Sequence, residues 1–116
     1  MSRPEQLAAL AAAKARLDPL ALYARPVDIG RVWILAPLWL FKLPWFSRFD
    51  GYAMWNLILL RDSALVGDAD LICHELCHVW QMQHHPIAMP LSYLRFGYAN
   101  NPYEAEARRA TAQSRG

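Results

Sequence analysis

Charge is scarce in this sequence. Only 19% of the 116 residues are charged, and twelve basic residues against ten acidic ones give a formal net charge of +2. This balance argues against a nucleic-acid partner, which requires a basic surface, and no run of Lys or Arg is longer than the pair Arg108-Arg109. Hydrophobic residues make up 55% of the chain, which is too apolar for a disordered protein. We therefore expect one folded domain over residues 1–116.

Cysteines and long apolar runs are also few. Two cysteines, Cys73 and Cys77, are too few for a disulfide framework. They lie four residues apart on a predicted helix, where a bridge between them would be strained. We therefore expect both to be small buried side chains. The apolar run at residues 32–41 is about half as long as a membrane-spanning helix requires. The N-terminus contains an acid and lacks the apolar core of a signal peptide, which predicts a cytoplasmic protein.

Four segments with different hydrophobic patterns predict an α+β fold. Three have helical spacing of apolar residues with a cap or a proline at an end, and the fourth is rich in β-branched and aromatic residues. They are a helical segment at residues 1–25, a strand-rich segment at 26–62, a capped helix at 68–85 and a second capped helix at 101–113. The pattern of residues 52–61 fits one strand, although residues 57–60 fit the start of a buried helix equally well. We expect residues 90–96 to form a short helix.

The capped helix at residues 68–85 contains a His-Glu-x-x-His motif, His74-Glu75-Leu76-Cys77-His78. Residues four apart share one face of a helix, so the two imidazoles can bind one metal ion. Glu75 is rotated off that face, near enough to reach a metal-bound water without being a ligand. Random placement of four His and four Glu gives this motif with a probability of roughly 0.005. The motif therefore predicts a metal site, and Zn²⁺ in such a site needs a third protein ligand.

The third ligand must come from outside the motif. His84 and His85 follow on the same helix, and His85 lies roughly 10 Å further along the axis, too far to share the ion. Glu104 and Glu106 are the only acidic residues after the motif, and both belong to the helix at residues 101–113. Each also has an ordinary structural interpretation, as a capping-box residue or as an acid favoured by the helix dipole. Both stay candidates on this basis.

With these two motifs the sequence resembles the gluzincin metallopeptidases, and most closely short bacterial proteins that contain little more than the catalytic core. The resemblance covers residues 54–110 and rests on a His-Glu-Leu-x-His-Val-x-Gln helix and an Asn-Pro-x-Glu-x-Glu-Ala helix. It implies a small zincin-like domain in which His74, His78 and a glutamate hold zinc and Glu75 is the general base. That glutamate is Glu104 in a Glu-x-x-Ala pattern, which we favour, and Glu106 in a Glu-Ala pattern.

The implied activity is zinc-dependent hydrolysis of a peptide or protein substrate by a metal-activated water. The acid that supports the site in this family would fall at Arg108 or Ala110, so the group that orients the histidines is left unassigned. We interpret Gln81 as facing solvent or capping the helix end, and the strand before the motif, at residues 54–61, as the edge that pairs with an extended peptide. The candidate oxyanion donors are the polar residues Tyr93, Arg95, Tyr98 and Tyr103.

Two other functions stay open at this point. One is a zinc-binding domain without proteolytic activity that acts in regulation or assembly. The other is a scaffold at a membrane surface, in which Trp33, Trp39 and Trp45 lie in the bilayer interface. Membrane contact is compatible with the sequence but is not what it predicts, and no feature of the sequence indicates the oligomeric state.

Overall fold

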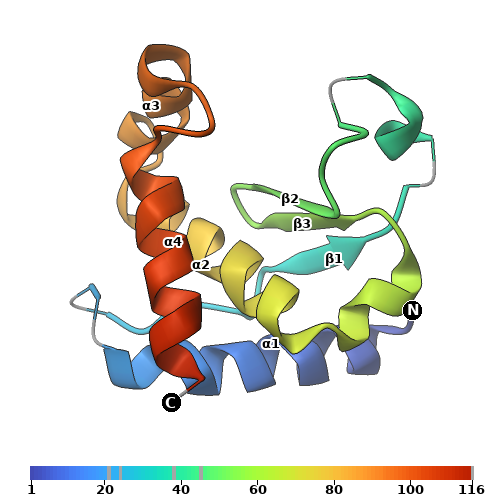
Figure 1. Cartoon of the computed structure of the whole chain (residues 1–116). Coiled ribbons are helices and arrows are strands. Elements are labelled where there is room, and N and C mark those ends of the chain that lie inside the picture. The colour runs from blue at the N-terminus through green and yellow to red at the C-terminus, as the bar shows by residue number, and fades with distance from the viewer. Residues whose placement is uncertain (21, 24, 38, 45, 116) are drawn as a thin grey trace.

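The computed structural model describes residues 1–20, 22–23, 25–37, 39–44 and 46–115, and within them the chain has four α-helices and a three-stranded sheet (Figure 1). The α+β class is therefore confirmed. The helices are α1 (Arg3–Leu17), α2 (Ala69–His84), α3 (Ala88–Phe96) and α4 (Pro102–Ser114), the strands are β1 (Trp33–Leu35), β2 (Gly51–Met54) and β3 (Leu57–Leu60), and the short 3-10 helices are η1 (Asp18–Leu20), η2 (Leu40–Lys42) and η3 (Ser63–Gly67).

Helices α1, α2 and α4 begin where local signals predict, whereas α3 begins at Ala88, two residues before the predicted start, without a side-chain cap. Asp68 and Asn101 are the N-caps of α2 and α4, and each side chain accepts a hydrogen bond from a backbone N–H of the first turn. Ser2 caps α1 in the same way. Gly97 follows α3 with a φ of 70°, a left-handed conformation that glycine adopts without strain. Local chemistry thus sets the ends of the two helices that carry the candidate ligands.

The sheet differs from the prediction. Residues 52–61 are not one strand but the hairpin of β2 and β3, which turns at Trp55 with a φ of 51°. Asn56 is the one polar residue in this turn, and a single asparagine between apolar residues also fits the alternating pattern of one continuous strand. The strand order is β1-β3-β2, with β1 parallel and β2 antiparallel to β3. The expected peptide-binding strand is therefore central over residues 57–60, and β1 and β2 are the two strands that each have one edge unpaired among the described residues.

Helix α2 lies in the middle of the core (Figure 1). Its buried apolar side chains pack against α1, against the sheet and against α4, and Trp80 also donates a hydrogen bond to the carbonyl of Arg25. Cys73 and Cys77 are fully buried and free, as predicted. Because α1, the sheet and α4 all contact α2, packing fixes the direction of its buried side chains.

None of the helices described is long and apolar enough to cross a bilayer. Of the three tryptophans considered for contact with a membrane surface, Trp33 and Trp39 are exposed, whereas Trp45 lies outside the described residues.

Candidate metal centre

His74 and His78 point toward each other across one turn of α2. Their Nε2 atoms are 3.2 Å apart, and the two rings are nearly perpendicular, with an interplanar angle of 87°. In a tetrahedral zinc site, bonds of 2.0–2.1 Å place neighbouring ligand atoms about 3.3 Å apart. The separation of the two Nε2 atoms therefore fits a shared ion.

Glu104 completes this arrangement from α4. Its Oε1 atom lies 2.7 Å from Nε2 of His74, and its Oε2 atom lies 2.9 Å from Nε2 of His78. The side chain is buried in the first turn of α4, where Asn101 accepts a hydrogen bond from its backbone N–H. The structure thus brings Glu104, and not Glu106, to the two histidines.

The contacts of Glu104 favour its charged form. Burial alone would raise the pKa of Glu104, but hydrogen bonds from His74 and His78 outweigh burial and hold the pKa well below its usual range. Burial would likewise lower the pKa of His78, and the hydrogen bond to Glu104 with the charge of Glu75 raises it instead. An ionised carboxylate between two imidazoles is a donor set suited to a divalent transition metal.

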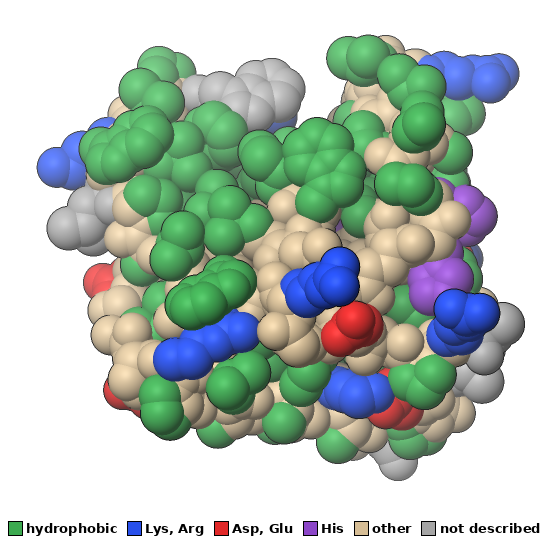
Figure 2. Space-filling view, turned by 180° about the vertical axis from the view of Figure 1, so that it is seen from behind, with side chains coloured by type: hydrophobic (Ala, Val, Ile, Leu, Met, Phe, Trp, Pro, Cys, Tyr) green, Lys and Arg blue, Asp and Glu red, His purple; other side chains and the backbone are tan. Residues whose placement is uncertain are grey.

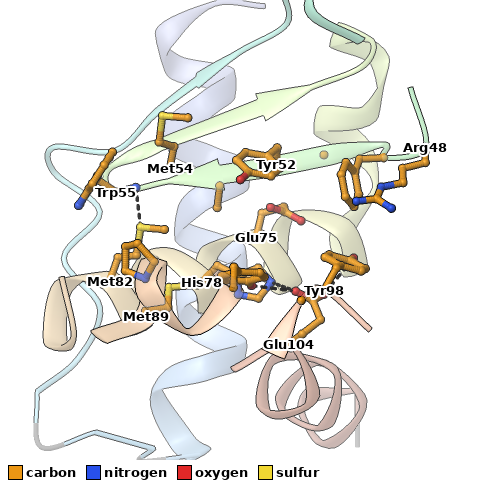
Figure 3. A pocket seen from close by; sticks show the side chains of 16 residues that line it. Arg48, Tyr52, Met54, Trp55, Glu75, His78, Met82, Met89, Tyr98 and Glu104 are labelled. Atoms are coloured by element: carbon orange, nitrogen blue, oxygen red, sulfur yellow. Dashed lines mark hydrogen bonds and ion pairs between the residues drawn. The ribbon is translucent and has the colours of Figure 1, made fainter. Parts of the chain in front are cut away.

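Glu75 lies beside this group without contacting the two histidines through a hydrogen bond. His74, Glu75 and His78 have ligand atoms within 4.8 Å of one another, a grouping that can hold a metal ion. The Glu75 carboxylate is buried, burial raises its pKa, and its Oε2 atom has no hydrogen-bond partner among the described residues. Figure 3 shows the side chain directed toward β2, on the cavity side of His78. A buried carboxylate with a free acceptor is available to a molecule in the cavity.

Gln81 is a residue whose role the sequence did not reveal. It is fully buried, so the interpretation that it faces solvent or caps the helix end is wrong. Its Oε1 atom lies 2.8 Å from Nδ1 of His78, and its Nε2 atom donates to the carbonyl of Tyr103 at 2.8 Å and to Oε1 of Glu106 at 3.1 Å. Gln81 follows His78 by three residues and His74 by seven, so helical spacing alone placed it on the face of the motif.

Glu106 supports Gln81 rather than the histidines. Its Oε1 atom accepts hydrogen bonds from the amide of Gln81 and from the hydroxyl of Tyr23, in the segment after α1. Burial, together with this hydrogen bond and the charge of Glu106, raises the pKa of Tyr23, so the tyrosine remains a donor. Gln81 therefore orients the ring of His78, and Glu106 holds Gln81 in place. This pair takes the role of the supporting acid that the sequence analysis sought at Arg108 or Ala110.

A cavity of about 250 Å³ opens beside Glu75, His78 and Glu104 (Figure 3). Glu75, His78 and Glu104 line its inner end, β2 forms one wall, and α3 with the residues that follow it forms the other. The walls are mostly aromatic or sulfur-containing: Phe49, Tyr52, Met54, Trp55, Met82, Met89, Tyr93 and Tyr98. Such walls suit an apolar group of a ligand.

Two of the four candidate oxyanion donors reach this cavity. The hydroxyls of Tyr93 and Tyr98 donate to the carboxylate of Glu104 at 3.1 and 3.2 Å. Burial and the charge of Glu104 raise the pKa of Tyr98 to about 12, so its hydroxyl keeps its proton at neutral pH. Arg95 and Tyr103 line a separate depression on the surface. His84 and His85 contact the ring of Tyr23 and lie away from the ligand group.

Comparison with known proteins gives no match, whether with protein-family models, with curated proteins or with solved structures. The function of the site is therefore argued from its own residues.

Proposed function

We propose that this protein is a zinc-dependent metallopeptidase of the gluzincin type, in which His74, His78 and Glu104 hold the metal. The observation that carries the proposal is that one carboxylate of α4 contacts the Nε2 atoms of both motif histidines. Two imidazoles and one carboxylate make up the protein ligands of many catalytic zinc sites, which keep a fourth position for water or substrate. A zincin-like fold, with a small sheet beside the motif helix, is part of the same proposal.

Glu75 is the proton carrier in this proposal. Zinc held by the three ligands would supply Lewis acidity, which polarises the scissile carbonyl and lowers the pKa of water. Oε2 of Glu75 accepts a proton from the attacking water as the new C–O bond forms. The same oxygen then gives the proton to the amine nitrogen as the C–N bond breaks. Its burial and its lack of a hydrogen-bond partner support this role.

Tyr93 and Tyr98 are the residues that would stabilise the carbonyl oxygen as negative charge develops on it. Both hydroxyls lie at the inner end of the cavity, and both remain protonated donors because burial raises their pKa values. The unpaired edge of β2 offers backbone groups to an extended peptide, which would bind as an added strand along the cavity. The apolar walls favour a substrate with a hydrophobic side chain near the scissile bond.

The proposal is tested by metal analysis followed by a hydrolysis assay. Purified protein should contain one zinc per chain, and His78→Ala should remove it. Glu75→Gln should keep the zinc but abolish cleavage of a mixture of fluorescence-quenched peptides. Absence of stoichiometric metal in the wild-type protein would refute the metal centre. Zinc without any cleavage by the wild-type protein would instead favour the alternative, a zinc-binding domain that acts in regulation or assembly.

A further inference from the structure

Two long stretches of the chain contain no acidic residue, although acids occur throughout the rest. They are residues 29–49 and 76–103, and their basic residues are Arg31, Lys42, Arg48 and Arg95. Both stretches contribute residues to the cavity, the first Arg48 and Phe49 and the second most of the wall opposite β2. The mouth of the cavity is therefore flanked by segments whose charge is positive only.

The same two stretches carry the most exposed hydrophobic side chains of the described residues. In the first, Trp39 is 68% exposed and Leu43 is also exposed. In the second, Ile87 is 72% exposed and Leu94 is 85% exposed. We call residues 39–44 with 46–48 the η2 ridge, and residues 87–98 the α3 ridge.

The two ridges project from the same end of the molecule. Figure 1 shows α3 on one side and the η2 loop on the other, both extending beyond β2. In Figure 2, hydrophobic side chains cover the half of the molecule that carries the ridges, whereas the acidic side chains in view lie in the opposite half. A flat surface could therefore contact both ridges at once.

We propose that the two ridges bind the surface of a lipid bilayer that contains anionic lipids. The exposed side chains of Trp39, Leu43 and Leu94 would enter the interfacial region, where such side chains are favoured. Lys42 and Arg95, which are the sequence neighbours of Leu43 and Leu94, would lie near the anionic headgroups. The proposal does not depend on metal or on hydrolysis, so it stands or falls separately from the proposed function.

Charge favours a bilayer over a second copy of the chain as the occupant. A symmetric dimer through the ridges would pair one patch with the same patch, and would bring the cations of both copies together. No acidic residue within either ridge is available to compensate them. An anionic lipid surface neutralises the same cations and accepts the exposed hydrophobic side chains.

The test is co-sedimentation of the purified protein with vesicles of phosphatidylcholine, with and without phosphatidylglycerol. We expect binding that strengthens with the anionic lipid and weakens with added salt. The double variant Trp39→Ser/Leu94→Ser should bind at least about tenfold more weakly, because it removes two large apolar side chains from the interface. Leu7→Ser is the matched control, since Leu7 is 38% exposed on α1, away from both ridges, and it should bind as the wild type does.

A second pair of variants isolates the charge. Lys42→Ala/Arg95→Ala should lower affinity for the anionic vesicles by about fivefold for each cation removed, whereas Arg109→Ala on α4 should not. Circular dichroism of each variant verifies that it is folded. Binding that is absent, that ignores phosphatidylglycerol, or that survives Trp39→Ser/Leu94→Ser would overturn the proposal. A dimer in analytical ultracentrifugation that this double variant dissociates would overturn it too, and would identify a second copy as the occupant.

Discussion

The amide of Gln81 determines which nitrogen of His78 carries the hydrogen. Its NH2 group faces two acceptors, the carbonyl of Tyr103 and the carboxylate of Glu106, so its oxygen must face Nδ1 of His78, 2.8 Å away. When His78 loses one proton, the remaining hydrogen therefore stays on Nδ1, and Nε2, which otherwise donates to Glu104, becomes free to bind a metal. A histidine held in this tautomer is prepared to bind a metal through Nε2.

Replacing Gln81 by leucine should weaken zinc binding. Gln81→Leu removes the hydrogen-bond acceptor of His78, so we expect zinc affinity to fall about 10- to 100-fold. It also leaves Glu106 with one hydrogen-bond donor fewer, so we expect the free energy of unfolding without metal to fall by about 1–3 kcal/mol. Competition with a chromogenic chelator measures the affinity, and urea unfolding measures the stability. Gln83→Leu is the control on the same helix, because Gln83 bonds to Asp28 and Asn56 at the surface. Equal zinc affinities for the two variants would contradict the role of Gln81.

Glu104 and Glu106 should respond differently to removal of metal. Zinc that binds only the folded protein stabilises it by about 2.7 kcal/mol at a free concentration 100 times the dissociation constant. We expect a chelator to lower the melting temperature of the wild type. Glu104→Ala should largely remove this effect, whereas Glu106→Ala should retain most of it, since Glu106 acts through Gln81. If only Glu106→Ala removes the chelator effect, the assignment of the third ligand is wrong, although a metal site remains.

The capping residues make the starts of the helices predictable from the sequence. They do not predict how one helix is rotated about its axis relative to another. Asp68 and Asn101 each bond to backbone N–H groups of the first turn of their own helix, so these caps can be recognised from neighbouring residues alone. The choice between Glu104 and Glu106 depends on the rotation of α4 against α2, because residues two apart point in very different directions on a helix. That rotation is set by the packing of Ala107 and Ala110 in the core.

The turn at Trp55 and the burial of Gln81 were missed for related reasons. A hairpin turn is recognised by Gly, Asn or Asp at its left-handed positions. Here Asn56 is in the turn, but the left-handed position belongs to Trp55, whose N–H contacts the sulfur of Met82. Gln81 is polar, and polar residues are mostly exposed. Its burial depends on acceptors from α4 that lie more than twenty residues away in the chain.

Gly51 should limit the position of Glu75. A Cβ atom at residue 51 would lie 3.3 Å from Cγ of Glu75 and 3.3 Å from Cδ1 of Leu71, so both side chains would have to shift slightly. We expect Gly51→Ala to cost about 1 kcal/mol in stability and to slow hydrolysis about tenfold, with zinc content unchanged because no ligand moves. Gly67→Ala is the control, since no atom lies within 4 Å of its added Cβ. Indistinguishable rates for the two variants would argue against Glu75 as the proton carrier.

Asp70 should make stability depend on pH. Hydrogen bonds from Arg115 and then Arg16 lower the pKa of Asp70 in the folded protein. A carboxyl group whose pKa is lower in the folded than in the unfolded protein stabilises the fold at pH values above its unfolded-state pKa. This stabilisation is lost as the pH falls through the folded-state pKa. Asp70→Asn should therefore have a lower melting temperature than the wild type at neutral pH, and the difference should shrink as pH falls below about 4.

High salt at neutral pH should also narrow this difference, because both ion pairs of Asp70 are partly exposed. Thermal scans of the two proteins across pH and salt measure both effects. A difference that stays constant from neutral to strongly acidic pH would show that the charge of Asp70 is not its cause.

The strand order has a consequence for how the chain is assembled during synthesis. β3 is the last strand in the sequence but the middle one in the sheet, so β1 and β2 have no partner until residues 57–60 emerge from the ribosome. The motif helix follows at once, and Glu104 is translated only after β1–β3, α2 and α3. A nascent chain therefore has both histidines and the wall at β2 before it has the third ligand. Under the proposed function it cannot cleave neighbouring nascent peptides until α4 has been made.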